Sequence, residues 1–527
     1  MGSRENQPEP TGPGSKYYAS RIHILHLNAP PHLHTPPSPL PSLQAYKTLI
    51  HHKTLHGPLL PNLHTFQWRD NAQVYDTLEP FVPAFAGYAL RSLEVFSTPR
   101  CRDRYAESGP KFVEDLLGEL YTLRRVSPFL RTFEHKLALL EFSASPSRSK
   151  TNAVSGCGRL GSGNGISRVI PSFANLTAYT CTKDFTYPEY LALSSLPSPE
   201  SIYGDIAACL DLPSLLTQER PLEFRSLKTL VLNHAHDSAG ADVGGLQILL
   251  SASRLPNLRK LALRWTRPLA FISALDKYDY DLLLRCLSTN CSHELLENIA
   301  IGVDSDKGIA SADHSPISSR WTIDITTISI LFTFRNLKRL VLTSRTTFFL
   351  GDNDLACLAS AWPRLTELRL KELDPATLMH HSRPMLVGIV YLAQRCPDLK
   401  TLGLTSIPTT SESSSGSTIT LLPATPWYHI LRLREPHHHP TPPPKLTHLL
   451  FPSCPVDSPD RIAKFLHKYL PNLQAERIDN FSMIPSTYGG HGGGGVYGAA
   501  SWVDVRAALR RLEERDGNGG LSRGSRG

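Results

Sequence analysis

The sequence predicts an α/β solenoid in which short parallel strands line a concave side and helices cover the convex side. The main observation is a phrase, Leu-x-x-Leu-x-Leu, that returns along the chain. Its clearest copies read Leu258-Arg-Lys-Leu261-Ala-Leu263, Leu337-Lys-Arg-Leu340-Val-Leu342, Leu365-Thr-Glu-Leu368-Arg-Leu370 and Leu399-Lys-Thr-Leu402-Gly-Leu404. A second observation is a proline that stands two residues before the first leucine of many copies. Together they indicate an irregular leucine-rich-repeat solenoid.

Each copy of the phrase predicts one short strand, because Leu-x-Leu alternates with period two and places its leucines on one buried face. Thirteen candidate copies begin at Ile22, Leu63, Leu90, Leu130, Leu176, Leu227, Leu258, Leu296, Leu337, Leu365, Leu399, Leu446 and Leu473. The copies from Leu227 to Leu446 are clear, the earlier ones are degraded, and the last places Glu476 at an apolar position. Their spacing of 27 to 51 residues exceeds the roughly 20–29 residues of typical leucine-rich repeats.

Prolines predict where each helix gives way to a strand. The prolines two residues before a first leucine are Pro61, Pro128, Pro256, Pro363, Pro397, Pro444 and Pro471. Proline cannot continue a helix, and it biases the preceding residue toward extended backbone. Parallel strands joined by helical crossovers and stacked in one dimension follow from this pattern.

The segments between the strands carry helical spacing. A helix is expected over residues 352–362, with one apolar face formed by Leu355, Leu358, Ala359 and Trp362. Another follows Ser458, an expected N-cap, with Pro459 at the first helical position. Residues 276–289 and 384–395 show the same spacing.

Composition shifts predict the domain boundaries. Residues 1–16 are expected to form a disordered tail and residues 17–480 the solenoid, interrupted by flexible insertions at about 145–165 and 408–444. Residues 481–500 are a Gly-rich loop, residues 501–515 a C-terminal capping helix, and residues 516–527 a second disordered tail.

Overall composition excludes several classes of function. The net charge of +8 is spread over 527 residues without a basic run, so no nucleic-acid partner is expected. The nine cysteines lack paired spacing, which favours reduced thiols in the cytoplasm or nucleus. No secretory signal is visible, and no stretch reaches the roughly 18 apolar residues of a membrane helix, so no membrane association is expected.

Motifs that suggest chemistry have simpler interpretations. Residues 156–161 match the dinucleotide-binding string Gly-x-Gly-x-x-Gly, but the strand and helix that the motif requires are not predicted around it, so a flexible loop is favoured. Cys286, Cys291 and His293 lack the second ligand pair of a zinc site, and core cysteines are favoured. The run His437–His439 lies in a Pro-rich loop without rigid geometry.

The carboxylates Asp276, Asp279 and Asp281 fit the first turn of the following helix, where they favour its dipole. No catalytic constellation, cofactor motif or metal site is therefore predicted, and the chain is expected not to be an enzyme.

The residues that alternate with the buried leucines form the expected binding surface. Five of them are basic, and they predict a mildly basic concave patch formed by Lys260, Arg264, Arg339, Arg369 and Lys371. Such a patch would bind an acidic or phosphorylated protein segment. The alternative interpretation is a solvated face without a special role.

The repeat region resembles fungal F-box/leucine-rich-repeat proteins. The similar segments are residues 353–368, residues 392–402, the Pro-x-Leu junctions at Trp362, Cys396 and Leu470, and the opening Tyr17-Tyr-Ala-Ser-Arg-Ile-His-Ile-Leu. In that family an N-terminal F-box docks on a Skp-type adaptor of a cullin ubiquitin ligase, and the repeats hold the substrate. Only sixteen polar residues precede the similarity here, so an F-box is expected either to be lost or to lie upstream of this sequence.

The resemblance implies a role in substrate recognition for an F-box-type ubiquitin ligase, with a Skp-type adaptor and a cullin as partners if an F-box lies upstream. The alternative is a stand-alone leucine-rich-repeat scaffold that binds a protein without a ligase connection.

Overall fold

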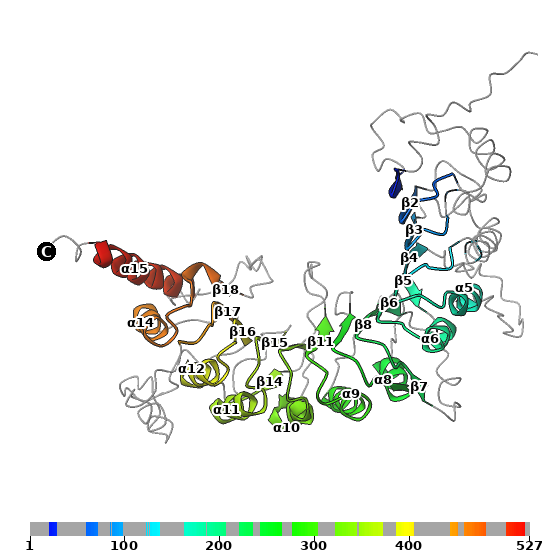
Figure 1. Cartoon of the computed structure of the whole chain (residues 1–527). Helices are drawn as coiled ribbons and strands as arrows, with labels where there is room; N and C mark the ends of the chain where they lie inside the picture. Colours follow the sequence, from blue (N-terminus) through cyan, green and yellow to red (C-terminus); the bar gives the residue numbers. More distant parts are fainter. Residues whose placement is uncertain are drawn as a thin grey trace, which may run out of the picture. The chain divides into compact units, whose positions relative to one another are not determined.

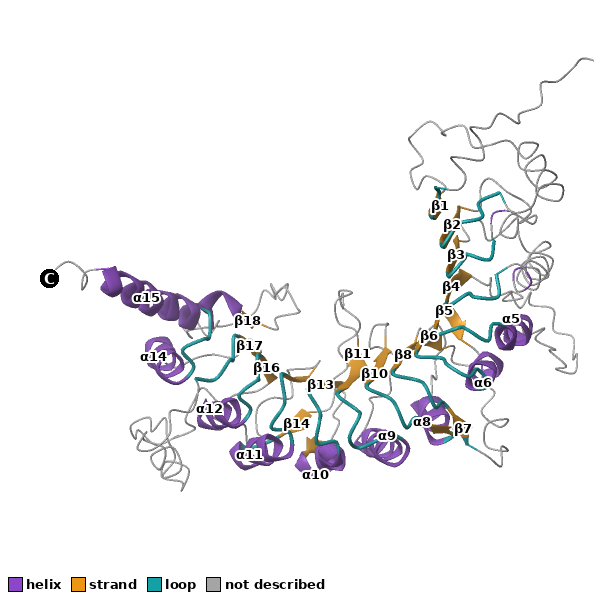
Figure 2. Cartoon of the chain, viewed as in Figure 1, coloured by secondary structure: helices purple, strands orange, loops and turns teal. Residues whose placement is uncertain are grey.

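The computed structural model divides into two compact units, Met1–Ala235 and His236–Gly527, called unit 1 and unit 2. It describes residues 21–28, 59–71, 85, 87–98, 123, 125, 127–137, 163–185, 187–206, 221–234, 243–265, 277–303, 322–344, 347–372, 386–404, 443–451, 458–480 and 502–521. Within each unit, parallel strands stack side by side in chain order, and helices lie along one face of the resulting sheet (Figures 1 and 2).

The described residues of unit 1 include a parallel sheet and the helices α5 and α6. Its sheet strands are β1 (Ile24–Asn28), β2 (Thr65–Asn71), β3 (Ser92–Thr98), β4 (Thr132–Leu137), β5 (Ala178–Phe185), β6 (Ser201–Ile206) and β8 (Thr229–His234). The helices are α5 (Gly163–Val169), the 3-10 helix η1 (Ile170–Ser172) and α6 (Tyr187–Ser194), and the short strand β7 (Leu222–Glu223) follows them. Each strand pairs with the next copy of the repeat, as in Thr65↔Ser92 and Ser92↔Thr132.

Unit 2 repeats this arrangement with longer helices. Its sheet strands are β10 (Lys260–Trp265), β11 (Asn298–Val303), β13 (Arg339–Ser344), β15 (Glu367–Glu372), β16 (Thr401–Leu404), β17 (His448–Phe451) and β18 (Ile478–Asn480). Its helices are α8 (Val243–Ser251), α9 (Lys277–Asn290), α10 (Ile325–Ser329), η2 (Ile330–Thr333), α11 (Asp352–Ala361), α12 (Leu386–Arg395), α14 (Pro459–Tyr469), η4 (Ala475–Arg477) and α15 (Trp502–Leu521). The short strands are β9 (Ser253–Arg254) and the parallel pair β12 (Thr322–Asp324) and β14 (Thr347–Phe349).

A β-turn leads into most strands and explains the recurring proline. In the turn before β15, the Leu365 N–H donates to the Trp362 carbonyl at 3.1 Å, and Pro363 takes the second position. The turns closed by Leu63, Leu258, Leu399 and Leu473 are built in the same way. Proline suits this position because its fixed φ matches the turn. The proline therefore ends the helix and also shapes the turn that starts the strand.

Asparagine side chains tie neighbouring turns together. The side-chain amide of Asn336 donates to the Glu294 carbonyl at 2.8 Å, and that of Asn472 donates to the Pro444 carbonyl at 2.9 Å. Each bond joins one repeat to the repeat before it, so it satisfies a turn carbonyl that would otherwise face water.

The leucines of the phrase form the core between sheet and helices. Leu340, Leu342, Leu368 and Leu370 are at most 1% exposed. Helix α11 covers this core with Leu355, Leu358 and Ala359, as its spacing predicts. Helix α14 begins at Pro459, as expected, although the hydroxyl of the expected N-cap Ser458 makes no capping hydrogen bond.

Two strands of the main sheets differ from the sequence prediction, one because it is additional and the other in its register. Strand β6 fills the 51-residue interval between the copies at Leu176 and Leu227 and pairs with β5 and β8. The sequence does not predict this strand, because Pro199 and Gly204 stand where the phrase has leucines. Only Ile202 remains apolar and fully buried. At the end of the sheet, η4 inserts before β18, so Ile478 instead of Glu476 pairs with Leu449.

The predicted boundaries are described only in part. Residues 1–16 and 481–500 lie outside the described residues, as do most of the insertions at 145–165 and 408–444. Helix α5 begins at Gly163, inside the first of these insertions. Helix α15 runs to Leu521, past the predicted end at 515, and Asp516 there accepts a 2.9 Å hydrogen bond from His467 of α14. This contact holds the last part of α15. The residues there are polar, so they lack the apolar spacing that would predict a helix.

Candidate protein-binding surface on unit 2

The sheet of unit 2 has one face free of helices in the described part of the chain, here called the open face (Figure 2). Its side chains are those that alternate with the buried leucines, and strand pairing aligns them in rows. The first row runs through Lys260, Asn298, Arg339, Glu367, Thr401 and His448. The second row runs through Ala262, Ala300, Val341, Arg369, Gly403 and Leu450.

Arg339, Glu367 and Arg369 form an ion cluster at the centre of the open face. Arg339 Nε donates to Glu367 Oε2 at 2.8 Å, and Arg369 Nε lies 2.6 Å from Glu367 Oε1. The arginine side chains are 36% and 40% exposed, whereas the glutamate side chain between them is 18% exposed. One carboxylate thus contacts two guanidinium groups, through a hydrogen bond from Arg339 and an ion pair with Arg369, and the cluster retains one net positive charge.

The neighbours of the cluster leave room around Arg369. Val341 and Gly403 flank it in its row, so its cross-strand neighbours are one small side chain and one residue without a side chain. The cluster therefore has polar neighbours in the first row and small or apolar neighbours in the second row.

The other predicted patch residues are placed differently. Lys260 is half-buried and lies in the row of Arg339, across Asn298, while Arg264 is exposed near the opposite end of its strand. Lys371 is only 8% exposed, so its expected place in an exposed patch is wrong. The end of β15 packs beside β14, and Glu372 there accepts a 2.7 Å hydrogen bond from the Phe348 N–H.

The residue before three strands of unit 2 is a cation that lies outside the predicted patch. Arg259, Lys338 and Lys400 occupy the second position of the phrase, where backbone hydrogen bonds join successive repeats. Arg259 and Lys400 are exposed, and Lys338 pairs with Glu297 at 3.0 Å. The signal was present in the sequence, because the second position of the phrase is basic in four of its clear copies, with Lys228 as the fourth.

The residues considered for zinc do not form a metal site. Cys286 Sγ lies 3.0 Å from Ser251 Oγ, and His293 Nε2 lies 2.7 Å from the Ser288 carbonyl. Cys291 is buried, and burial raises the pKa of its thiol to about 12, so it stays protonated. No group of three or more side chains able to ligate a metal gathers in the described ranges. The Gly156–Gly161 string and His437–His439 lie outside them.

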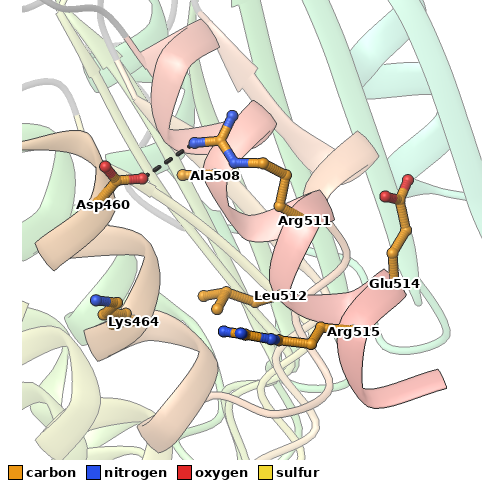
Figure 3. A pocket seen from close by; sticks show the side chains of 7 residues that line it. All are labelled: Asp460, Lys464, Ala508, Arg511, Leu512, Glu514 and Arg515. Carbon is orange, nitrogen blue, oxygen red and sulfur yellow. Dashed lines mark hydrogen bonds and ion pairs between the residues drawn. The ribbon is translucent and has the colours of Figure 1, made fainter. Parts of the chain in front are cut away.

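A cleft of about 450 Å³ lies between α14 and α15 in unit 2 (Figure 3). It is lined by Asp460, Lys464, Ala508, Arg511, Leu512, Glu514 and Arg515. Arg511 donates to Asp460 at 3.0 Å across the cleft, and the remaining charges at its rim have both signs. The mixed charges give it no preference for one ligand class. Within the described residues, no helix combines the length and the apolar character that crossing a membrane requires.

Comparison with known proteins identifies no family. No protein-family model matches the sequence, and no curated protein matches it. Among solved structures, a leucine-rich-repeat protein of Leptospira interrogans is similar, with 14% identity, coverage of 89% of this chain and 87% of that chain, and a TM-score of 0.35. A TM-score this low does not establish a shared fold. The repeat character of this chain therefore rests on its own parallel strands, turns and buried leucines.

Proposed function

We propose that this chain is a non-catalytic module that binds another protein through the open face of unit 2. The observation that carries the proposal is the ion cluster of Arg339, Glu367 and Arg369, half-exposed in the middle of a face that no described helix covers. Flat sheets of aligned side chains on repeat proteins offer extended binding surfaces.

The partner is an acidic or phosphorylated segment. A phosphate or carboxylate can accept hydrogen bonds from the remaining N–H groups of both arginines, which Glu367 holds near each other through a hydrogen bond to Arg339 and an ion pair with Arg369. Lys260 and Arg264, with Arg259 and Lys400 at the edge, add positive charge around this point. Lys371 is left out of the proposed site because it is buried.

Reversal of the two arginines tests the site. We expect Arg339→Glu with Arg369→Glu to weaken binding of phosphoserine-containing acidic peptides at least tenfold, because the cluster changes from one net positive to three negative charges. Fluorescence anisotropy of the full chain with phosphorylated and unphosphorylated peptides measures this. Arg461→Glu, an exposed charge reversal on α14, is the matched control and should leave binding unchanged. Equal binding by both variants would exclude the cluster as the site.

At the finer level, we propose substrate recognition for an F-box-type ubiquitin ligase, supported by the resemblance of the repeats to fungal F-box/leucine-rich-repeat proteins. Affinity purification of the full chain should then recover a Skp-type adaptor and a cullin. Their repeated absence, with other partners retained by the open face, would favour a stand-alone scaffold. The variant with Arg339→Glu and Arg369→Glu distinguishes the two proposals. If the chain recognises a ligase substrate, loss of the arginines abolishes substrate binding but leaves the adaptor bound.

A further inference from the structure

Unit 1 carries an exposed aromatic and cationic surface at the turns that lead into β3 and β4. We call it the edge patch, and it is formed by Tyr88, Arg91, Phe129 and Arg131. Tyr88 is 67% exposed and Phe129 is 49% exposed, and both rank among the most exposed large apolar side chains of the described residues. Arg131 is also exposed. Single exposed apolar residues are common, so the significance of this pair depends on its surroundings.

The turn itself does not require these aromatic rings. Phe129 occupies the third position of its turn, Ser127-Pro-Phe-Leu130, and the corresponding position in other turns is held by Asn62, Asn257, Arg364 and Asn472. Those turns close with the same hydrogen bond between the first residue and the leucine. A polar residue is therefore sufficient for the fold at this position, and the exposed phenylalanine lacks a structural reason.

Arg91 joins the two aromatic turns into one surface. Its Nη1 donates to the Tyr88 carbonyl at 2.8 Å and to the Leu90 carbonyl at 3.3 Å, and its guanidinium carbon lies 5.1 Å from the centre of the Phe129 ring. Cation–π contact and two backbone bonds hold this side chain in place. An arginine held against the Tyr88 backbone and the Phe129 ring, with exposed Tyr and Phe side chains in the same two turns, has the composition that dominates binding energy at protein interfaces.

The charge of the edge patch selects an acidic partner. Arg131 follows Arg91 in a row of equivalent positions in successive repeats, and its backbone N–H donates to the Arg91 carbonyl at 2.8 Å. The next side chain in that row is Thr177, and the acid after it, Glu200, is bound to Lys228 at 2.7 Å. Along this part of the row, therefore, no carboxylate of the described residues lies beside Arg91 or Arg131.

We infer that the edge patch binds a segment of another protein in which an apolar side chain lies next to a carboxylate. The apolar side chain would pack on Phe129 and Tyr88, and the carboxylate would accept hydrogen bonds from Arg131 and from the free edge of Arg91. This surface lies in unit 1 and uses different residues from the ion cluster of unit 2, so it stands independently of the proposed function.

Short fluorescent peptides test the edge patch on the full chain. One set alternates Asp or Glu with Leu or Phe, a second set replaces the acids by amides, and a third replaces the apolar residues by serine. The first set is expected to bind, and Phe129→Asn and Arg131→Glu should each weaken its binding about tenfold. Binding should also weaken as salt is raised, because the contact includes exposed charges.

Two controls distinguish a specific loss of binding from a loss of folding or a general surface effect. Phe129→Asn recreates the sequence Pro-Asn-Leu found at residues 61–63, 256–258 and 471–473, so the turn is retained, and an unchanged circular dichroism melt would show this. Leu191→Ala removes an exposed apolar side chain from α6 of the same unit and should leave binding unchanged. Equal binding of all three peptide sets, or full binding by Phe129→Asn, would overturn the inference. It would also be overturned if Phe129→Asn changed only self-association, measured by sedimentation.

Discussion

Gly302→Ala is expected to lower the free energy of unfolding of unit 2 by about 3 kcal/mol or more. Gly302 has a φ of +148°, a conformation that residues with a side chain rarely adopt. A methyl group there would lie 2.5 Å from the Thr343 carbonyl oxygen and 2.7 Å from the Thr343 nitrogen of the adjacent strand. Backbone atoms cannot move aside without opening the sheet between β11 and β13.

The displacement would extend to helix α9. The Thr343 carbonyl accepts a 2.8 Å hydrogen bond from the hydroxyl of Tyr280, which is fully buried on α9. Burial raises the pKa of Tyr280, so its hydroxyl stays protonated and available as a donor. A shift of Thr343 would therefore also break the bond that fixes this helix to the sheet.

Urea unfolding followed by circular dichroism measures the effect. Gly351→Ala is the matched control, because its backbone is extended and the nearest atom to an added methyl group is Asp354 Oδ2 at 3.8 Å. As an N-cap position it should lose about 1 kcal/mol or less. Similar losses for the two variants would show that the contact of Gly302 with Thr343 does not limit stability.

Trp362→Ala is expected to cost about 3–5 kcal/mol. Trp362 is fully buried where α11 ends and the turn into β15 begins, and its ring meets the ring of Phe332 edge-on at 5.3 Å. Its carbonyl accepts hydrogen bonds from the Leu365 N–H at 3.1 Å and from Cys396 Sγ at 3.4 Å. The residue therefore joins its own repeat to the next one, and the alanine variant leaves a large cavity at that junction.

Trp362→Phe provides the comparison, since it keeps an aromatic ring in the same place and removes less volume. Its loss should be clearly smaller than that of the alanine variant, measured as the shift in urea midpoint at constant slope. If alanine and phenylalanine destabilised the chain equally, packing of the ring would not be the source of the effect.

The features that the sequence predicts are local ones. A leucine pair two residues apart and a proline two residues ahead are enough to define a strand, its turn and the end of the preceding helix, as at Pro363 and Leu365. Strand β6 was missed because its repeat keeps only Ile202 of the three apolar positions, so its register is set by pairing with β5 and β8. Strand β6 is therefore identified by its pairing with neighbouring strands and not by its own sequence.

The candidate site depends on contacts across strands. Period-two alternation places Arg339 and Arg369 on the open face, but their joint contact with Glu367 requires the register of β13 against β15. Lys371 has the same alternation and is nevertheless buried. Alternation identifies a face of a strand, whereas exposure depends on which segments lie over that face.

Lysine footprinting of a partner-bound sample tests the central claim most directly. The full chain is labelled with an amine-reactive reagent, alone and in complex with a phosphorylated acidic peptide, and labelling is quantified by mass spectrometry. Binding on the open face predicts that Lys260, Lys338 and Lys400 become protected, whereas Lys464 and Lys468 on α14 label as before. Protection of the two α14 lysines with no change at Lys260, Lys338 and Lys400 would contradict it.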